Sequence, residues 1–144
     1  MSDENTIELL KECNSGIKMA VSSFDEVLDK IESEKLKNLI VETKSTHEKL
    51  GDETHVLLNE HHDSEKDPNP IAKAMSYMKT NMKMMQHPGD QEIADLMIDG
   101  CNMGIKSVCK YMNKYSDADE KAKSVAREII KVEEKLMIEL REFL

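Results

Sequence analysis

The chain has 144 residues, of which 34% are charged and only 3% are aromatic, with no tryptophan. This length suits one domain with a real core, and the composition favours long helices over a β-sheet protein. The net charge of −9 argues against DNA, RNA or an anionic membrane as a partner, because each of these would be repelled.

The remaining bulk features favour a cytoplasmic protein. Residues 1–5 lack the basic flank and the apolar run of a signal peptide. No apolar stretch approaches the ~20 residues that a membrane-spanning helix needs. The three cysteines form no Cys-x-x-Cys motif, so we expect reduced thiols.

Start and stop signals along the chain predict five helices, at about 4–31, 34–60, 70–86, 91–115 and 120–143. Ser33 is the expected N-cap of the second helix, and Asn69-Pro70 opens the third. Asp90 is the expected cap of the fourth, and Asp117 to Glu120 has the spacing of a capping box before the fifth.

Apolar residues recur at alternating spacings of three and four along the four long helices, which predicts one inward stripe on each. The first stripe includes Leu10, Ile17 and Phe24, with Asn14 as its one polar member. The expected inward positions of the other helices include Leu36, Leu39, Thr43, Thr46, Leu50, Leu57, Ile93, Met97, Gly100, Gly104, Tyr111, Val125, Ile129, Val132, Leu136 and Leu140.

A helical hairpin occurs twice in the sequence. Five of the six residues in 13–18 are repeated 88 positions later in 101–106, as Cys-Asn-x-Gly-Ile-Lys. A second set of matches runs from 34–53 to 120–139 at an offset of 86. Two sets of matching residues in the same order indicate an internal duplication of the pair of long helices.

The order of the helices predicts the topology. Short links make each long pair an antiparallel hairpin, and the unique third helix can carry the chain back along the bundle. The second and fourth helices then run parallel. We therefore predict a single all-α domain over 1–144, with hairpin 4–60, crossover helix 70–86 and hairpin 91–143.

This chain resembles the ferritin-like superfamily, and most closely its uncharacterised bacterial members with a helical crossover. The resemblance rests on the helix order and on Cys-Asn-x-Gly-Ile-Lys early in each hairpin, and it covers nearly the whole chain. It implies a ferritin-like four-helix bundle built from a duplicated hairpin, with an extra crossover helix. It also implies a di-metal carboxylate site at the centre of the bundle.

The ligand pattern of such a site is missing. It needs a Glu from each of two helices and Glu-x-x-His from the other two. The chain has no Glu-x-x-His, and its nearest approach, Asp52 to His55, lies near the end of the second helix. We therefore expect an apolar core in its place, with no ferroxidase or oxygenase activity.

His47, in the middle of the second helix, is equivalent in the repeat to Glu133. If both turned inward, they could pair across the bundle or hold a metal with other carboxylates. The candidate metal ligands are Glu12, Glu42, His47, Glu128 and Glu133. Our expectation for His47 is nevertheless a solvated flank.

Other features favour packing roles. Gly16 and Gly104 are equivalent in the repeat, which suggests close approach of the first and fourth helices. The crossover carries a methionine stripe, which we expect to pack on the bundle, although it could instead bind copper or a partner helix. Its members are Met75, Met78, Met82 and Met85.

The sequence thus favours a non-enzymatic structural or interaction module without a cofactor. We expect an unidentified protein partner or a homo-oligomer, and neither nucleic acid nor membrane. The alternative is a metal-binding protein that holds iron, manganese or zinc at the candidate residues named above.

Overall fold

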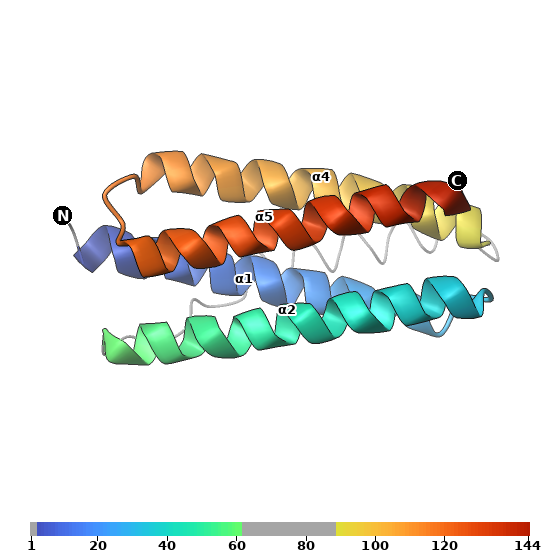
Figure 1. The fold of residues 1–144 in the computed structure, drawn as a ribbon, viewed down its shortest axis with the longest axis horizontal. Helices are drawn as coiled ribbons and strands as arrows, with labels where there is room; N and C mark the ends of the chain where they lie inside the picture. The colour runs from blue at the N-terminus through green and yellow to red at the C-terminus, as the bar shows by residue number, and fades with distance from the viewer. Residues whose placement is uncertain (1–2, 62–88) are drawn as a thin grey trace.

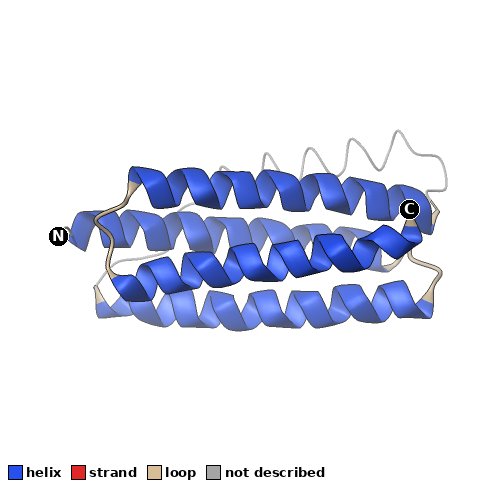
Figure 2. Cartoon of the chain, turned by 45° about the horizontal axis from the view of Figure 1, so that its top comes forward, coloured by secondary structure: helices blue, strands red, loops and turns tan. Residues whose placement is uncertain are grey.

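The computed structural model describes residues 3–61 and 89–144, and within them the fold is all-α, as predicted. Four long helices pack side by side as a bundle (Figures 1 and 2). They are α1 (Asp3–Leu28), α2 (Glu34–Glu60), α4 (Asp90–Lys114) and α5 (Glu120–Leu140), followed by a short 3-10 helix, η1 (Arg141–Phe143). The predicted crossover helix 70–86, with its methionine stripe, lies outside the described residues.

The directions of the four helices agree with the predicted topology. Figure 1 shows α1 and α5 running one way along the bundle and α2 and α4 running the other way. In the described residues, α1 packs against the other three long helices, and α5 packs against both α2 and α4. Because α2 ends at one end of the bundle and α4 begins at the other, the two hairpins do not form an up-down-up-down bundle (Figure 1).

Two of the helix starts use a side-chain cap. Ser33 Oγ accepts the backbone N–H of Leu36 at 3.2 Å, so the predicted cap of α2 is confirmed. The cap of α5 is Asp119, whose carboxylate accepts the N–H of Ala122 at 2.9 Å. The prediction that placed the start of this capping motif at Asp117 was two residues early.

The prediction for Asp90 was wrong in a more informative way. The N-cap of α4 is Gly89, and Asp90 is the first helical residue. Its carboxylate accepts the backbone N–H groups of Glu32 and Ser33, each at 2.9 Å. Asp90 therefore joins the start of the second hairpin to the turn of the first, instead of capping its own helix.

The buried apolar residues form two clusters, one toward each end of the bundle. The first, near the α1–α2 turn, includes Phe24, Val27, Leu36, Ile40, Ile93, Met97, Leu136 and Leu140. The second includes Leu9, Leu10, Ile17, Leu50, Leu57, Leu58, Val125 and Ile129. His47 lies between Ile40 and Leu50 along α2, and Glu133 between Ile129 and Leu136 along α5, so polar residues occupy the middle of the core.

The predicted stripes were too narrow in places and included exposed residues in others. Buried residues flank them on every long helix, among them Leu9, Ile40, Leu58, Ala94, Cys101 and Ala126. Thr46 and Gly100, in contrast, are exposed. A bundle helix buries a wider face than a coiled-coil seam, because it contacts more than one neighbour.

The glycines do not mark a close approach of α1 and α4, so that prediction was wrong. Within the described residues, a Cβ added at Gly16 or at the exposed Gly100 would meet no atom within 4 Å besides the neighbouring backbone of its own helix. A Cβ at Gly104 would meet the carboxyl group of Glu133 on α5, at 3.8 Å. The tight position is Gly51 on α2, where a Cβ would lie 3.3 Å from Cγ2 of Ile17.

Four consecutive residues of α1, Glu12 to Ser15, are buried. Successive residues of an α-helix are turned by about 100°, so α1 is enclosed on every side at this level. None of the described helices is both long and apolar enough to cross a membrane.

Candidate functional site

The centre of the bundle contains a buried pair of ionisable side chains, His47 from α2 and Glu133 from α5. Nε2 of His47 lies 3.0 Å from Oε1 of Glu133. His47 is fully buried, and Glu133 is 6% exposed. The expectation of a solvated flank for His47 was therefore wrong, and the two residues pair across the bundle.

The hydrogen bonds of His47 determine how its protons are arranged. Nδ1 lies 2.9 Å from the carbonyl oxygen of Thr43, one turn earlier on α2. A carbonyl oxygen can only accept, so Nδ1 carries a proton. The contact with Glu133 then needs one further proton, held either by Nε2 or by the carboxyl group. Both arrangements leave the pair without net charge, so neither buries an uncompensated charge.

Cys101 of α4 is the third member of this cluster. Burial raises the pKa of its thiol, and Glu133 raises it further, through its negative charge and by accepting the thiol hydrogen bond. The thiol is therefore held in its protonated form, as a donor to the carboxylate. The sequence contained one signal for it, because Cys101 belongs to the repeated Cys-Asn-x-Gly-Ile-Lys motif, but packing was the role predicted from that motif.

An aromatic ring closes the cluster on the side of α1. The rings of Phe24 and His47 meet edge to face, with centroids 5.1 Å apart and an interplanar angle of 77°. Phe24 is itself buried in the first apolar cluster. The cluster thus takes one side chain from each of the four long helices, with Phe24 of α1 and Cys101 of α4 next to the contact between His47 and Glu133.

The other predicted metal ligands do not join this pair. Glu42 and Glu128 are exposed, and each lies five residues before the paired residue of its helix, which places it on another helical face. Glu12 is buried and has an interaction of its own. It lies 12 residues before Phe24 on α1, which is about 18 Å along the helix axis.

These positions do not fit a di-metal carboxylate centre. Within 3–61 and 89–144, no group of three or more His, Cys, Asp or Glu side chains is arranged to hold a metal ion. The imidazole and the carboxylate that come closest are hydrogen-bonded to each other, and they share their surroundings with a protonated thiol.

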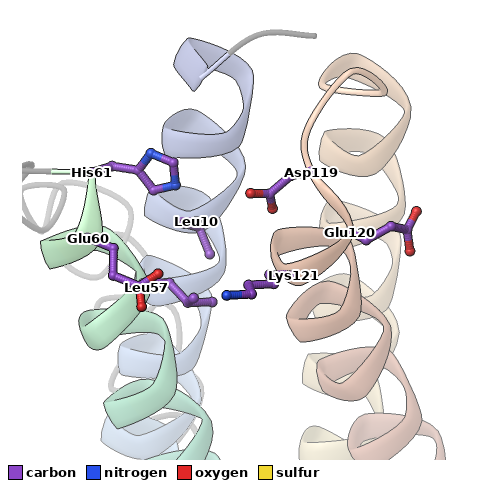
Figure 3. Close-up of a pocket in the computed structure, with 7 residues that line it drawn as sticks. All are labelled: Leu10, Leu57, Glu60, His61, Asp119, Glu120 and Lys121. Carbon is purple, nitrogen blue, oxygen red and sulfur yellow. The ribbon is translucent and has the colours of Figure 1, made fainter.

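A hollow of about 500 Å³ opens at one end of the bundle, between the end of α2 and the start of α5 (Figure 3). It is lined by Leu10, Leu57, Glu60, His61, Asp119, Glu120 and Lys121. Two of its carboxylates already have partners, because Asp119 caps α5 and Glu120 accepts from Arg127 at 2.9 Å. Figure 3 shows Lys121 extending toward α2, while Glu120 points away from the hollow.

Two polar groups of α1 have no hydrogen-bond partner among residues 3–61 and 89–144. They are Nδ2 of Asn14 and Oγ of Ser15, and both are buried. An unpaired buried polar group costs about 1–3 kcal/mol. Asn14 and Ser15 correspond in the repeat to Asn102 and Met103 of α4, which are exposed, so the two halves differ in burial at these positions.

No protein-family model, curated protein or solved structure matches this chain.

Proposed function

We propose that this chain is a non-enzymatic, ferritin-like helical bundle that acts as a structural or interaction module. The proposal rests on one observation, which is that His47 has no ring nitrogen left for a ligand. Both ring nitrogens are used within the bundle, by Thr43 and Glu133, and the side chain is fully buried. A general base or a metal ligand needs a free nitrogen facing its substrate or ion.

The buried thiols support the same role. Burial raises the pKa of Cys13 to about 12, and burial together with Glu133 also raises the pKa of Cys101. The thiolate is the nucleophilic form of cysteine, so neither residue is activated for covalent or redox chemistry. Cys13 is buried in the second apolar cluster, as a small residue that fills the core, and Cys101 is held as a protonated donor to Glu133.

The ferritin-like part of the proposal rests on the course of the chain. Two antiparallel hairpins are arranged with α2 parallel to α4, which is the order of helices in that superfamily (Figure 1). In this bundle the central positions hold a hydrogen-bonded imidazole and carboxylate in place of a set of metal ligands. We therefore propose that the role of the middle of the bundle is structural.

The second candidate is a metal-binding protein that holds iron, manganese or zinc. It is favoured by one observation, the approach of a His and a Glu to 3.0 Å in the core. In this case the ion would replace the shared proton, and Glu42 or Glu128 would have to move inward from exposed positions to complete the ligand set.

Metal analysis of the purified full chain separates the two candidates. The protein is incubated without oxygen with Fe²⁺, Mn²⁺ or Zn²⁺, freed of unbound ions, and analysed for metal per chain. We expect far less than one ion per chain, and iron oxidation no faster than in buffer. A stoichiometric metal content that His47→Gln and Glu133→Gln abolish, and that the matched surface variant Lys49→Gln keeps, would favour the metalloprotein.

A further inference from the structure

The outer face of α4 carries its charges in two separate blocks. Every acidic residue of this helix precedes Gly100, and every basic residue follows Ile105. Six of these residues are exposed: Glu92, Asp95, Asp99, Lys106, Lys110 and Lys114. Between the blocks lie Asn102 and Met103, both exposed, and the side chain of Met103 is 53% accessible.

These residues belong to one stripe of the helix surface. Their spacings of three, four and seven residues return to the same side of an α-helix, because one turn takes about 3.6 residues. The stripe is therefore acidic over its first half, basic over its second half, and uncharged at its midpoint. We call it the α4 stripe.

The helix dipole does not account for this separation. Acidic residues are favoured in the first turn of a helix and basic residues in the last turn, but the effect fades beyond those turns. Asp99 and Lys106 lie well inside α4, which runs from Asp90 to Lys114. The blocks also place like charges four residues apart, as in Asp95 with Asp99, and such pairs destabilise an isolated helix.

The other exposed helix faces are arranged differently. On α5, acidic and basic residues alternate and form pairs such as Arg127 with Glu120 and Lys135 with Glu139. On α2, Lys37 lies 3.9 Å from Glu34. In the part of the chain that the structure describes, none of the four inner charges of the α4 stripe makes an ion pair; these are Asp95, Asp99, Lys106 and Lys110.

The stripe is complementary to itself when one copy is turned end to end. Asp99 and Lys106 are equidistant from the point between Asn102 and Met103, and so are Asp95 and Lys110. Two antiparallel α4 helices related by a two-fold axis through this point would oppose each aspartate to a lysine of the other copy. A closed two-fold interface uses the same surface on both chains, and this surface has the required symmetry.

We propose that the α4 stripe is a self-association surface, and that its partner is a second copy of this chain packed antiparallel to it. Asp95 and Asp99 of each copy pair with Lys110 and Lys106 of the other, around a central contact of the two Met103 side chains. Gly100, at the edge of the stripe, leaves room for the second helix, because an added Cβ would meet no side chain of the described residues within 4 Å. The inference names a partner for the proposed interaction module and rests on that role.

The full-length chain tests this proposal by sedimentation equilibrium over a wide range of protein concentrations. Two salt concentrations are compared, about 0.1 M and about 1 M, between which the Debye length falls from about 10 Å to about 3 Å. We expect a monomer–dimer equilibrium whose dissociation constant rises at least about tenfold at high salt, because the exposed pairs are screened. A chain that stays monomeric at all concentrations in the lower salt would overturn the proposal.

Charge reversal identifies the surface. The variant Lys106→Glu with Lys110→Glu makes all four inner charges of the stripe acidic, so we expect a monomer. The control, Lys49→Glu with Lys131→Glu, changes the net charge by the same amount at exposed sites on α2 and α5, and should still dimerise. Equal loss of association in both double variants would show that net charge alone governs it, and would reject the α4 stripe.

Mixing gives the most specific outcome. In the variant Asp95→Lys with Asp99→Lys, all four inner charges of the stripe are basic, and this variant should also be monomeric on its own. Combined with the Lys106→Glu, Lys110→Glu variant, it should form a one-to-one heterodimer, since each inner charge then faces its opposite. Absence of the heterodimer, with both variants folded by circular dichroism, would contradict the proposal. These results are independent of the metal content, so failure here leaves the non-enzymatic role to be judged separately.

Discussion

His47 and Glu133 contact each other from equivalent positions of the two repeated hairpins. Their separation of 86 residues equals the offset of the second repeat in the sequence, and the atoms Nε2 and Oε1 lie 3.0 Å apart. Equivalent positions that touch lie where the internal two-fold relation of the bundle passes through the core. At this point the two halves carry different groups, an imidazole and a carboxyl, which can share one proton.

The first prediction concerns the stability that this pair provides. Replacing His47 by Ala leaves Glu133 buried without its main partner, so we expect the free energy of unfolding to fall by about 3–5 kcal/mol. This is well above the change of about 0.5 kcal/mol expected for an exposed position. Urea denaturation followed by circular dichroism measures it, with Lys49→Ala, an exposed position of the same helix, as the control.

A double variant shows whether pairing is the cause. We expect His47→Leu combined with Glu133→Leu to be more stable than the Glu133→Leu single variant, because the imidazole is then not left buried without its carboxyl partner. If the decreases in the free energy of unfolding of the two single variants simply add in the double variant, the two residues stabilise the fold independently. That result would contradict the prediction that their contact is the cause.

The second prediction follows from the pKa of Cys13. Burial raises it from 9.0 to about 12. Below pH 9 the thiol is protonated in both the folded and the unfolded chain. Between these two values the folded protein still binds a proton that the unfolded chain has released. The free energy of unfolding therefore falls as the pH rises, by up to about 1.4 kcal/mol per pH unit.

Lysines and tyrosines titrate in the same range, so the test is a difference between variants. The stability advantage of the wild-type protein over Cys13→Ala should shrink steadily from pH 9 upward. Cys109→Ser, at an exposed position, should follow the wild-type profile. Parallel profiles for the wild type and Cys13→Ala would mean that Cys13 ionises as easily in the folded chain as in the unfolded one.

The third prediction is the order in which the thiols react. Cys109 is exposed, whereas Cys13 and Cys101 are buried, and the pKa of each buried thiol is raised. At pH 8 we expect one thiol per native chain to react rapidly with a disulfide reagent, and three in urea. Mass spectrometry of the labelled peptides identifies the site, and rapid native labelling of Cys101 would contradict its burial against Glu133.

The fourth prediction concerns Asp90. Its carboxylate accepts two backbone N–H groups of the α1–α2 turn, so Asp90→Ala should lower the free energy of unfolding by about 1–2 kcal/mol. Asp90→Asn keeps one acceptor oxygen and should lose less. The comparison is Asp29→Ala, an exposed position whose contact is with the neighbouring Lys30, for which we expect a change within about 0.5 kcal/mol.

Local signals made much of the fold predictable from the sequence. Ser33 acts on a backbone group three residues away, and the apolar stripes repeat within each helix, so both can be recognised without knowing the tertiary structure. The bounds of α2 were predicted without error for the same reason. Asp90 was misassigned because its carboxylate accepts backbone N–H groups that lie 57 and 58 residues earlier in the chain. No local sequence pattern indicates such a contact.

The centre of the bundle was less predictable because its residues are polar. A histidine among charged neighbours is typical of a solvated helix face, and the apolar pattern of α2 does not include His47. Its burial is favourable only because Glu133 of the other hairpin provides a hydrogen-bond partner for Nε2. The repeat did align the two positions, and this alignment was the one sequence feature that could have favoured pairing over solvation.

The contact at the centre also affects which hairpins can assemble with which. Two copies of the first hairpin, packed about the same axis, would bring two imidazoles together, each already donating through Nδ1 to its own helix. Two copies of the second hairpin would oppose two carboxylates, which repel when both are ionised. A first hairpin with a second hairpin supplies a matched donor and acceptor. The bundle thus discriminates against like-with-like assembly, although its two halves share so much sequence.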